Sequence, residues 1–368
     1  MIARPWSTLT AFAAAVSLAA VPRVHAAGGS TASAEPHLAM RTGLKCSACH
    51  VNRSGGGGRS AFGSVYAQTQ LPWKTTAARN RALNDYLALG FDVRTVASGY
   101  VSDASPRTSI DLEEANVYME ARLIDRVLAL YVDQTLGPGR ADAREAFALV
   151  EQLPLNGYAK AGKFLLPYGL RLQDDLEFIR QQTGFSYDTP DQGVELGIEP
   201  GPLSWILAVT NGSSGGPEGN SGKQLTSSAA LVFRHFRLGA SASHNELDGV
   251  ARRRVFGGFG GARLGPLTLL GEVDRIEEVL PSSVKLEQDA AYVAGDLLLT
   301  KGVSAKVTYG YFDKSRAIPE DERVRWRFGL ELFPAGFARL AAFYTADVWI
   351  PQATADRDRI SLEFHLHF

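Results

Sequence analysis

The chain has 368 residues, which is enough for one large domain or two of ordinary size. Its formal net charge is −1, and a nearly neutral chain argues against nucleic acid as a partner. After the first 26 residues no apolar run reaches about 18 residues, which excludes a helical membrane protein. A membrane β-barrel is not excluded, because barrel strands give only a weak alternating signal.

Residues 1–26 have the pattern of a signal peptide. Arg4 provides a basic start, Leu9 to Val21 an apolar run, and Val24-His25-Ala26 a small-residue cleavage site. We therefore expect export from the cytoplasm and a mature chain that begins near Ala27.

The segment Cys46-Ser47-Ala48-Cys49-His50 contains both cysteines of the chain and reads C-x-x-C-H. In an exported protein this spacing is the attachment signature of haem c. Each thiol adds to one vinyl group of the haem, and the adjacent histidine binds the iron from the proximal side. The pattern predicts one covalent haem c held by Cys46, Cys49 and His50. A redox disulfide would need a thioredoxin-like βαβ pattern, and a zinc site would need a second Cys pair; the sequence has neither.

Residues 27–90 are predicted to form a small monohaem segment. Gly55 to Gly58 disfavour a helix and indicate either a close approach to a bulky group, such as a haem edge, or a flexible loop. Ala61 to Gln70 and Thr75 to Leu89 have helical patterns. Because so short a segment builds a marginal core, we expect it to lean on the next domain and plug it.

From Phe91 onward the hydrophobic pattern changes to period two, which predicts strands. The expected strands lie near 91–102, 108–121, 126–135, 143–152, 156–166, 191–199, 203–211, 225–235, 237–246, 252–263, 266–276, 286–299, 302–312, 322–333, 337–347 and 358–368. They number sixteen, and bacterial single-chain outer-membrane barrels have an even number.

Two further features favour a barrel in lipid over a soluble sandwich. Several strands carry one apolar and one polar face, as in Ile360 to Phe368, and tight turns alternate with longer polar connections. The predicted fold class is all-β: residues 91–368 form a 16-stranded antiparallel transmembrane β-barrel, preceded by the small α-helical haem segment. Bacterial outer-membrane lipid then surrounds the barrel, and the haem segment lies on the periplasmic or lumen side.

The longest connection, roughly Pro167 to Pro190, resembles by position the inward-folded loop of general porins. Its acidic residues would face arginines of the wall across a constriction, or both sets are ordinary solvated charges. The acidic set is Asp174, Asp175, Glu177 and Asp188, with Asp191 beyond; the basic set is Arg252, Arg254, Arg323, Arg325, Arg327 and Arg359.

A haem motif in front of a barrel resembles the outer-membrane monohaem cytochrome–porin fusions that oxidise ferrous iron. The resemblance rests on Pro36 to His50 (PHLAMRTGLKCSACH) and on Arg59-Ser60-Ala61-Phe62-Gly63. It implies haem binding by Cys46, Cys49 and His50, and electron transfer rather than conventional enzyme catalysis. It carries over no iron-binding residue.

The second axial ligand of the iron is left open by the sequence. Met40 and His37 precede the motif and would have to fold back over the haem. His365 and His367 share the lumen face of the last strand, within ~10 Å of the periplasmic rim at ~3.3 Å per residue. The more ordinary interpretation is that they are polar lumen residues without a role at the haem.

The leading functional prediction is a haem-bearing barrel that moves electrons across the outer membrane, with ferrous iron as one candidate donor and Glu320, Asp321 and Glu322 attracting it. A periplasmic electron carrier and an extracellular donor or acceptor are the expected partners, and a homo-oligomer is compatible with a sixteen-stranded porin. The alternative is a diffusion porin for small, for example anionic, solutes in which the haem segment is a plug or sensor. A third hypothesis is a haem-dependent reductase of small oxyanions.

Overall fold

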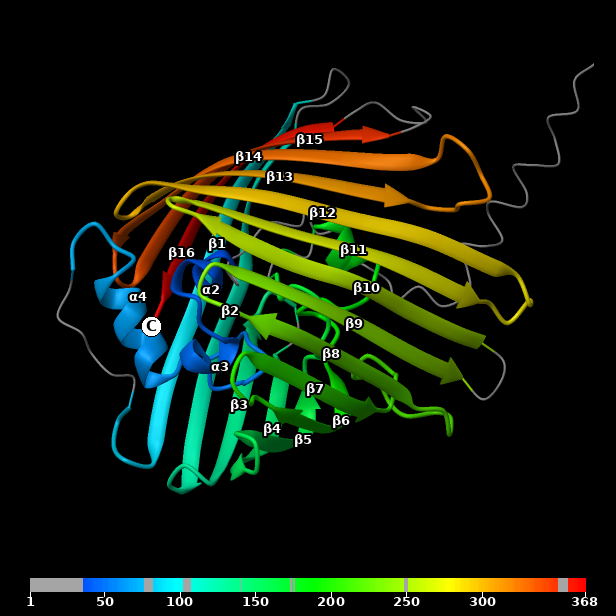
Figure 1. The fold of residues 1–368 in the computed structure, drawn as a ribbon. Helices are drawn as coiled ribbons and strands as arrows, with labels where there is room; N and C mark the ends of the chain where they lie inside the picture. Colours follow the sequence, from blue (N-terminus) through cyan, green and yellow to red (C-terminus); the bar gives the residue numbers. More distant parts are fainter. Residues whose placement is uncertain are drawn as a thin grey trace, which may run out of the picture.

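The computed structural model describes residues 36–75, 82–101, 107–139, 141–172, 174, 176–247, 251–349 and 357–368. The predicted signal peptide, residues 27–35 and Asp175 lie outside this described part. Sixteen antiparallel strands close into one barrel, with β1 (Leu87–Val101) paired to β16 (Arg357–His367), so the predicted fold class is confirmed (Figure 1).

Every strand pairs with its neighbours in chain order around the barrel. The other strands are β2 (Arg107–Ile124), β3 (Leu128–Gly137), β4 (Asp142–Leu153), β5 (Gly157–Phe164), β6 (Asp191–Ile198), β7 (Leu203–Thr210), β8 (Gln224–Val232), β9 (Phe236–Leu247), β10 (Ala251–Leu264), β11 (Leu267–Val279), β12 (Lys285–Thr300), β13 (Val303–Asp313), β14 (Glu322–Ala335) and β15 (Ala338–Trp349).

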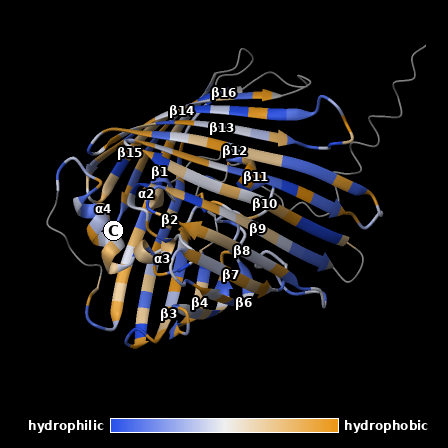
Figure 2. Ribbon diagram, viewed as in Figure 1, coloured by the Kyte–Doolittle hydropathy of each residue, from blue (hydrophilic) through white to orange (hydrophobic). Residues whose placement is uncertain are grey.

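The alternation along each strand separates an apolar outer face from a polar lumen. In β14, Trp326 and Phe328 are 41% and 47% exposed, whereas Arg325 and Arg327 are 6% and 3% exposed. Figure 2 shows the same alternation of apolar and polar residues along other strands. An apolar outer surface over a charged interior is what a barrel in a bilayer needs. None of the helices in the described ranges is long and apolar enough to cross a membrane.

The two ends of the barrel differ. Short turns such as Thr300 to Val303 share one end with the start of β1 and the end of β16, and longer connections share the other. Short turns face the periplasm in barrels of this architecture, and longer loops face outward. We use the names short-turn end and long-loop end below.

The N-terminal segment lies at the short-turn end and enters the lumen. It contains α2 (Pro36–Thr42), α3 (Cys46–Cys49) and α4 (Ala61–Thr69). Figure 1 shows α2 and α3 inside the strands and α4 at the rim beside the C-terminus. The helix expected over Thr75 to Leu89 is wrong in its described part, because β1 already begins at Leu87 and the residues from Ala82 are not helical. Pairing of Leu87 with Ala121 on β2 outweighs the local helical pattern.

The connection between β5 and β6 folds inward, as its resemblance in position to the inward-folded loop of general porins implied, and carries α5 (Phe178–Gln181). It is bonded to the wall on several sides: Tyr168 Oη donates to Asp274 at 2.8 Å, and Arg253 donates to the Thr183 carbonyl at 2.7 Å. Phe178 and Ile179 are fully buried against the barrel interior. The lumen is thus occupied by two segments that are far apart in sequence.

The lumen orientation expected for Arg252 and Arg254 is wrong. Both are exposed, and Arg253 between them reaches the inward connection instead. The three consecutive arginines show no alternation of polar and apolar residues, so polarity alone could not assign which of them face the lumen. The next two residues fix the register, because Val255 is buried and Phe256 is exposed.

The glycine run offers a test of how tightly the N-terminal segment is seated. Gly57 has φ +63°, and a Cβ there would overlap the Tyr131 hydroxyl, whereas Gly201 has φ +52° with nothing nearby. We expect Gly57→Ala to expose Arg53 and Arg59 to trypsin in the folded detergent-solubilised protein. Gly201→Ala carries the same left-handed backbone cost of ~1–2 kcal/mol without the overlap. Mass spectrometry of the fragments measures both; equal protection in the two variants would contradict the seating.

Candidate functional site

The C-x-x-C-H motif forms a single helical turn. His50 ends this turn in an extended conformation, and its backbone N–H donates to the Cys46 carbonyl at 3.1 Å. This geometry sets both cysteines and the histidine on one short, bent piece of backbone. Both cysteines are free thiols and partly accessible.

Helix α4 holds this turn from behind. Ser60 caps α4 by accepting from the Gly63 N–H at 3.1 Å, and its own hydroxyl donates to the Ala48 carbonyl at 2.7 Å. A Cβ at Gly63 would overlap the Cys49 carbonyl oxygen. The Ser60 and Gly63 positions of the sequence motif therefore have a physical role, which is close packing of α4 on the cysteine turn.

The glycine run passes close to bulky groups, but these are tyrosines of the protein. Gly56 lies against Tyr187 of the inward connection, and the Gly58 N–H donates to the Tyr131 hydroxyl of β3 at 2.6 Å. Gly55, Gly56 and Gly57 all have positive φ. The backbone of this stretch is held between the rings of Tyr187 and Tyr131, so it is not a flexible loop.

Cys46, Cys49 and His50 line one large cavity at the short-turn end of the lumen. Its empty space, including the mouth, is about 1470 Å³. His365 and His367 of β16 line the same cavity.

The lining fits the chemistry of a haem. Apolar side chains from four separate regions, including Leu44, Ile206, Phe259 and Phe333, provide contacts for a macrocycle. The lining also has an excess of cations, which suits a group with two propionates: Lys45, Arg53, Arg59, Arg171 and Arg237 against Glu199.

The electrostatics of the motif suit metal ligation by the imidazole. Burial, and then the neighbouring Arg59 cation, lowers the pKa of His50 to about 4. The imidazole is therefore neutral at physiological pH, which is the form that binds a metal. Burial raises the pKa of the Cys49 thiol, so this thiol is not an activated nucleophile by itself.

Polar contacts attach the motif to the barrel wall. Arg53 pairs with Glu151 at 3.0 Å and with Glu199 at 2.8 Å, while Ser47 donates to Glu199 at 2.8 Å. Lys45 Nζ donates to the carbonyls of Glu199 and Leu203 at 3.1 and 2.6 Å. Apart from the pair of Arg53 with Glu151 of β4, these contacts converge on the turn between β6 and β7, and together they fix the orientation of α3 in the lumen.

The four candidates for a second axial ligand divide into two pairs. Met40 is 1% exposed and packs against the wall near Gly261, in a core cluster with Phe259 and Leu270. His37 is 1% exposed and faces Asp296 of β12 at 3.6 Å. Neither lines the cavity, whereas His365 and His367 do.

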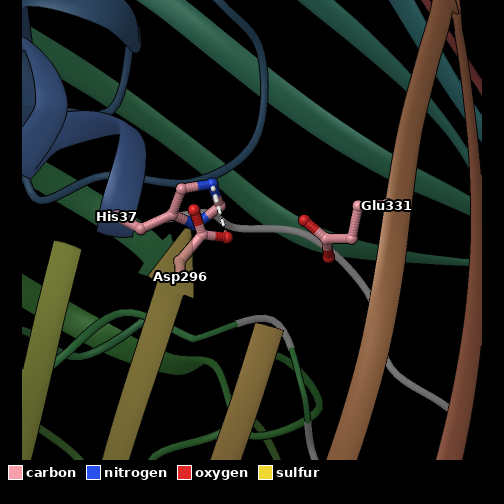
Figure 3. Close-up of side chains that lie close together, drawn as sticks. All are labelled: His37, Asp296 and Glu331. Atoms are coloured by element: carbon pink, nitrogen blue, oxygen red, sulfur yellow. Dashed lines mark ion pairs between the residues drawn. The ribbon is translucent and has the colours of Figure 1, made fainter. Parts of the chain in front are cut away.

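His37, Asp296 and Glu331 form a buried group whose ligand atoms lie within 4.8 Å of one another, so their number and spacing would suit a metal ion. Figure 3 shows His37 facing Asp296, with Glu331 across from them on another strand. The carboxylates already have cationic partners: Arg41 pairs with Asp296, and Arg339 pairs with Glu331 at 2.6 Å. The cluster serves here as an ion-pair network that docks α2.

Only some of the acidic residues predicted at the constriction contact the arginines predicted on the wall. Asp174 pairs with Arg327, and Thr308 donates to Glu177 at 3.1 Å. Asp188 is exposed, and Asp191 accepts hydrogen bonds from the turn after β7. On the wall, Arg323 and Arg359 point inward and lie over the rings of Phe178 and Tyr100. Glu320, Asp321 and Glu322 lie at the long-loop end, at and just before the start of β14.

Sequence reasoning missed Arg59, Glu199 and Asp92 as parts of the site. Arg59 forms an isolated bridge with His50, and Asp92 of β1 lies 2.8 Å from His365. Only the three-dimensional closure of β1 on β16 brings Asp92 to the site, so no local signal reveals it. Arg59 stands in a motif of the sequence, but its position beside His50 follows from the reversal of the glycine run.

No family model and no curated protein matches this chain. Solved structures do match in fold. A loop-deletion mutant of OmpT, an outer membrane protein of Vibrio cholerae, has a TM-score of 0.62 at 16% identity over 77% of this chain and 100% of its own. An anion-selective porin from Comamonas acidovorans has a TM-score of 0.62 at 9% identity, covering 77% and 99% of the two chains. In-vitro folded OmpT of Vibrio cholerae in a trimer form has a TM-score of 0.59 at 16% identity, covering 77% and 100%. At these identities the likeness establishes the barrel fold alone.

Proposed function

We propose that this protein is an outer-membrane barrel that binds one haem c covalently in its lumen and moves electrons across the outer membrane. The observation that carries the proposal is the cavity that Cys46, Cys49 and His50 share with His367 inside a barrel. Thioether attachment at the two thiols and ligation by the neutral His50 imidazole would hold the haem there. The bound haem supplies a one-electron redox centre.

The residues of this chain have three tasks in that proposal. Leu44, Ile206 and Phe333 exclude water from the macrocycle, and Arg171 and Arg237 are placed for the propionates. The β6–β7 turn holds α3 in orientation through Glu199. A periplasmic electron carrier would dock at the short-turn end, where the cavity lies.

Extracellular ferrous iron is the electron donor that the resemblance to cytochrome–porin fusions implies. The outer-membrane proteins that have the same fold support an outer-membrane location for this protein. The trimer form of OmpT supports a homo-oligomer as one arrangement.

The competing proposal is a diffusion porin for small anions, in which the N-terminal segment is a plug or sensor. The solved structures with the same fold favour it, since one of them is an anion-selective porin. Inward arginines such as Arg325 and Arg327 would suit anions, but both are already paired with carboxylates: Arg325 with Asp347 at 2.5 Å and Arg327 with Asp174.

Covalent attachment is tested by replacing both thiols. The double variant Cys46→Ala/Cys49→Ala is expected to lose the haem-stained band of outer-membrane fractions and the mass increment of one haem. Ala48→Ser is the matched control, because it changes the same helical turn and leaves the thiols and the Ser47–Glu199 contact in place. An unstained wild-type band from cells that mature c-type cytochromes would contradict haem binding.

Conductance tests the form of the diffusion porin in which the N-terminal segment is a sensor and the lumen stays open, since a plugged porin shares the low conductance of the electron-transfer barrel. With the N-terminal segment seated in the lumen, the whole protein is expected to show low conductance in planar bilayers, and a variant lacking residues 27–75 a conductance severalfold higher. The intact β1 start at Leu87 leaves the barrel of the variant complete. High, anion-selective conductance that is unchanged by the deletion would favour the diffusion porin.

A further inference from the structure

The last strand of the barrel carries two histidines that the proposed haem site does not yet use. His365 and His367 are 2% and 4% exposed, and they project from β16 into the cavity that contains the cysteine turn. Buried imidazoles are uncommon unless they form a hydrogen bond, pair with a charged group or bind a ligand.

The two histidines differ in what engages them. Nε2 of His365 lies 2.8 Å from the Asp92 carboxylate, and its Nδ1 is buried without a hydrogen-bond partner among the described residues. His367 has a buried Nδ1 of the same kind, and no hydrogen bond to a described residue occupies its Nε2. Nε2 is the nitrogen at the tip of the ring and the less hindered one for ligating a bulky metal complex.

Position also favours His367 over His365. His367 pairs with Asp92 in the register of β1 and stands closer to the short-turn end, while His365 pairs with Arg94 deeper in the barrel. Arg59 forms an isolated bridge with His50 and lines the same cavity as His367. The rings of His365 and His367 meet edge to face with centroids 4.9 Å apart, so His365, which lies against the Asp92 carboxylate, packs on its neighbour.

The rival candidates are used elsewhere in the fold. The Met40 thioether is enclosed in the core cluster with Phe259 and Leu270, and His37 faces the Asp296 carboxylate. Bringing either of them to the cavity would require α2 to leave the wall and break the Arg41 contacts to Asp296 and Ser304.

We propose that His367 is the second axial ligand of the haem iron, opposite His50, with His365 as its positioning residue. This inference rests on the proposed haem attachment. It gives the iron two imidazole ligands from the two ends of the described chain. Since His50 precedes β1 and His367 ends β16, the iron would connect the N-terminal segment to the seam at which the barrel closes.

The test uses the purified, haem-loaded wild-type protein and three single variants, with absorption and electron paramagnetic resonance spectra as readouts. We expect a low-spin, six-coordinate spectrum in the wild type and a high-spin spectrum in His367→Ala, with covalent haem retained on stained gels. Added imidazole is expected to restore the low-spin spectrum of His367→Ala. His365→Ala tests the positioning role, and we expect it to retain covalent haem and to give a mixture of low-spin and high-spin spectra. Met40→Leu is the control for α2 and is expected to keep the low-spin spectrum.

A second variant protects the test against a folding defect. His367→Met keeps a ligand at the position, and a thioether ligand raises the reduction potential of the haem relative to two imidazoles. The expected result is a low-spin spectrum with a higher potential than that of the wild type.

Distinct outcomes separate the two proposals. A wild type that carries no covalent haem overturns the proposed function. A haem-loaded wild type that is already high-spin, or a His367→Ala variant that keeps the wild-type low-spin spectrum, overturns the assignment of His367 and leaves haem attachment standing. Loss of the low-spin spectrum in Met40→Leu but not in His367→Ala would move the ligand to α2.

Discussion

A sixteen-stranded barrel encloses more space than its own lumen side chains can fill, and the rest of this structure follows from that constraint. Without an occupant, the lumen would be a water-filled channel lined by charge. Here two segments enter it: the N-terminal segment with α2 and α3, and the β5–β6 connection with α5. They meet where Arg171 donates to Ser54 at 3.4 Å and Gly56 lies against Tyr187.

Filling the lumen buries charged groups of the wall, and the entering segments supply their partners. Lys160 and Glu195 are fully buried at 2.9 Å from one another, and Lys160 also donates to Asn52 at 3.1 Å. Asn52 in turn donates to Glu145 at 2.7 Å. Breaking a buried pair by removing one partner costs about 3–5 kcal/mol, so such networks hold the segment in one orientation. The orientation of the cysteine turn, and hence the position of the cavity, depends on them.

The sequence predicted the barrel because period-two alternation extends over long strands such as β14, where the outward Trp326 and Phe328 alternate with the inward Arg325 and Arg327. It failed at the Arg-Arg-Arg run of β10, where neighbouring residues are equally polar, and at Leu87, where strand pairing outweighs a helical pattern. Within the site, local spacing identified Cys46, Cys49 and His50. Which histidine shares their cavity depends on barrel closure, since His367 and Asp92 are neighbours only through the pairing of β1 with β16. Spacing along the chain carries no information about that contact.

Electron transfer from one side of a membrane to the other is the most direct test of a haem-bearing barrel that conducts electrons. Haem-loaded protein is reconstituted in sealed vesicles that contain an oxidised soluble cytochrome, and ferrous iron is added outside. The account predicts reduction of the trapped cytochrome with the wild type and loss of this reduction when both cysteines are replaced by alanine. Equal reduction by the two proteins would mean that the barrel simply admits the ion, and no reduction by the haem-loaded wild type would contradict an electron-transfer role with this donor.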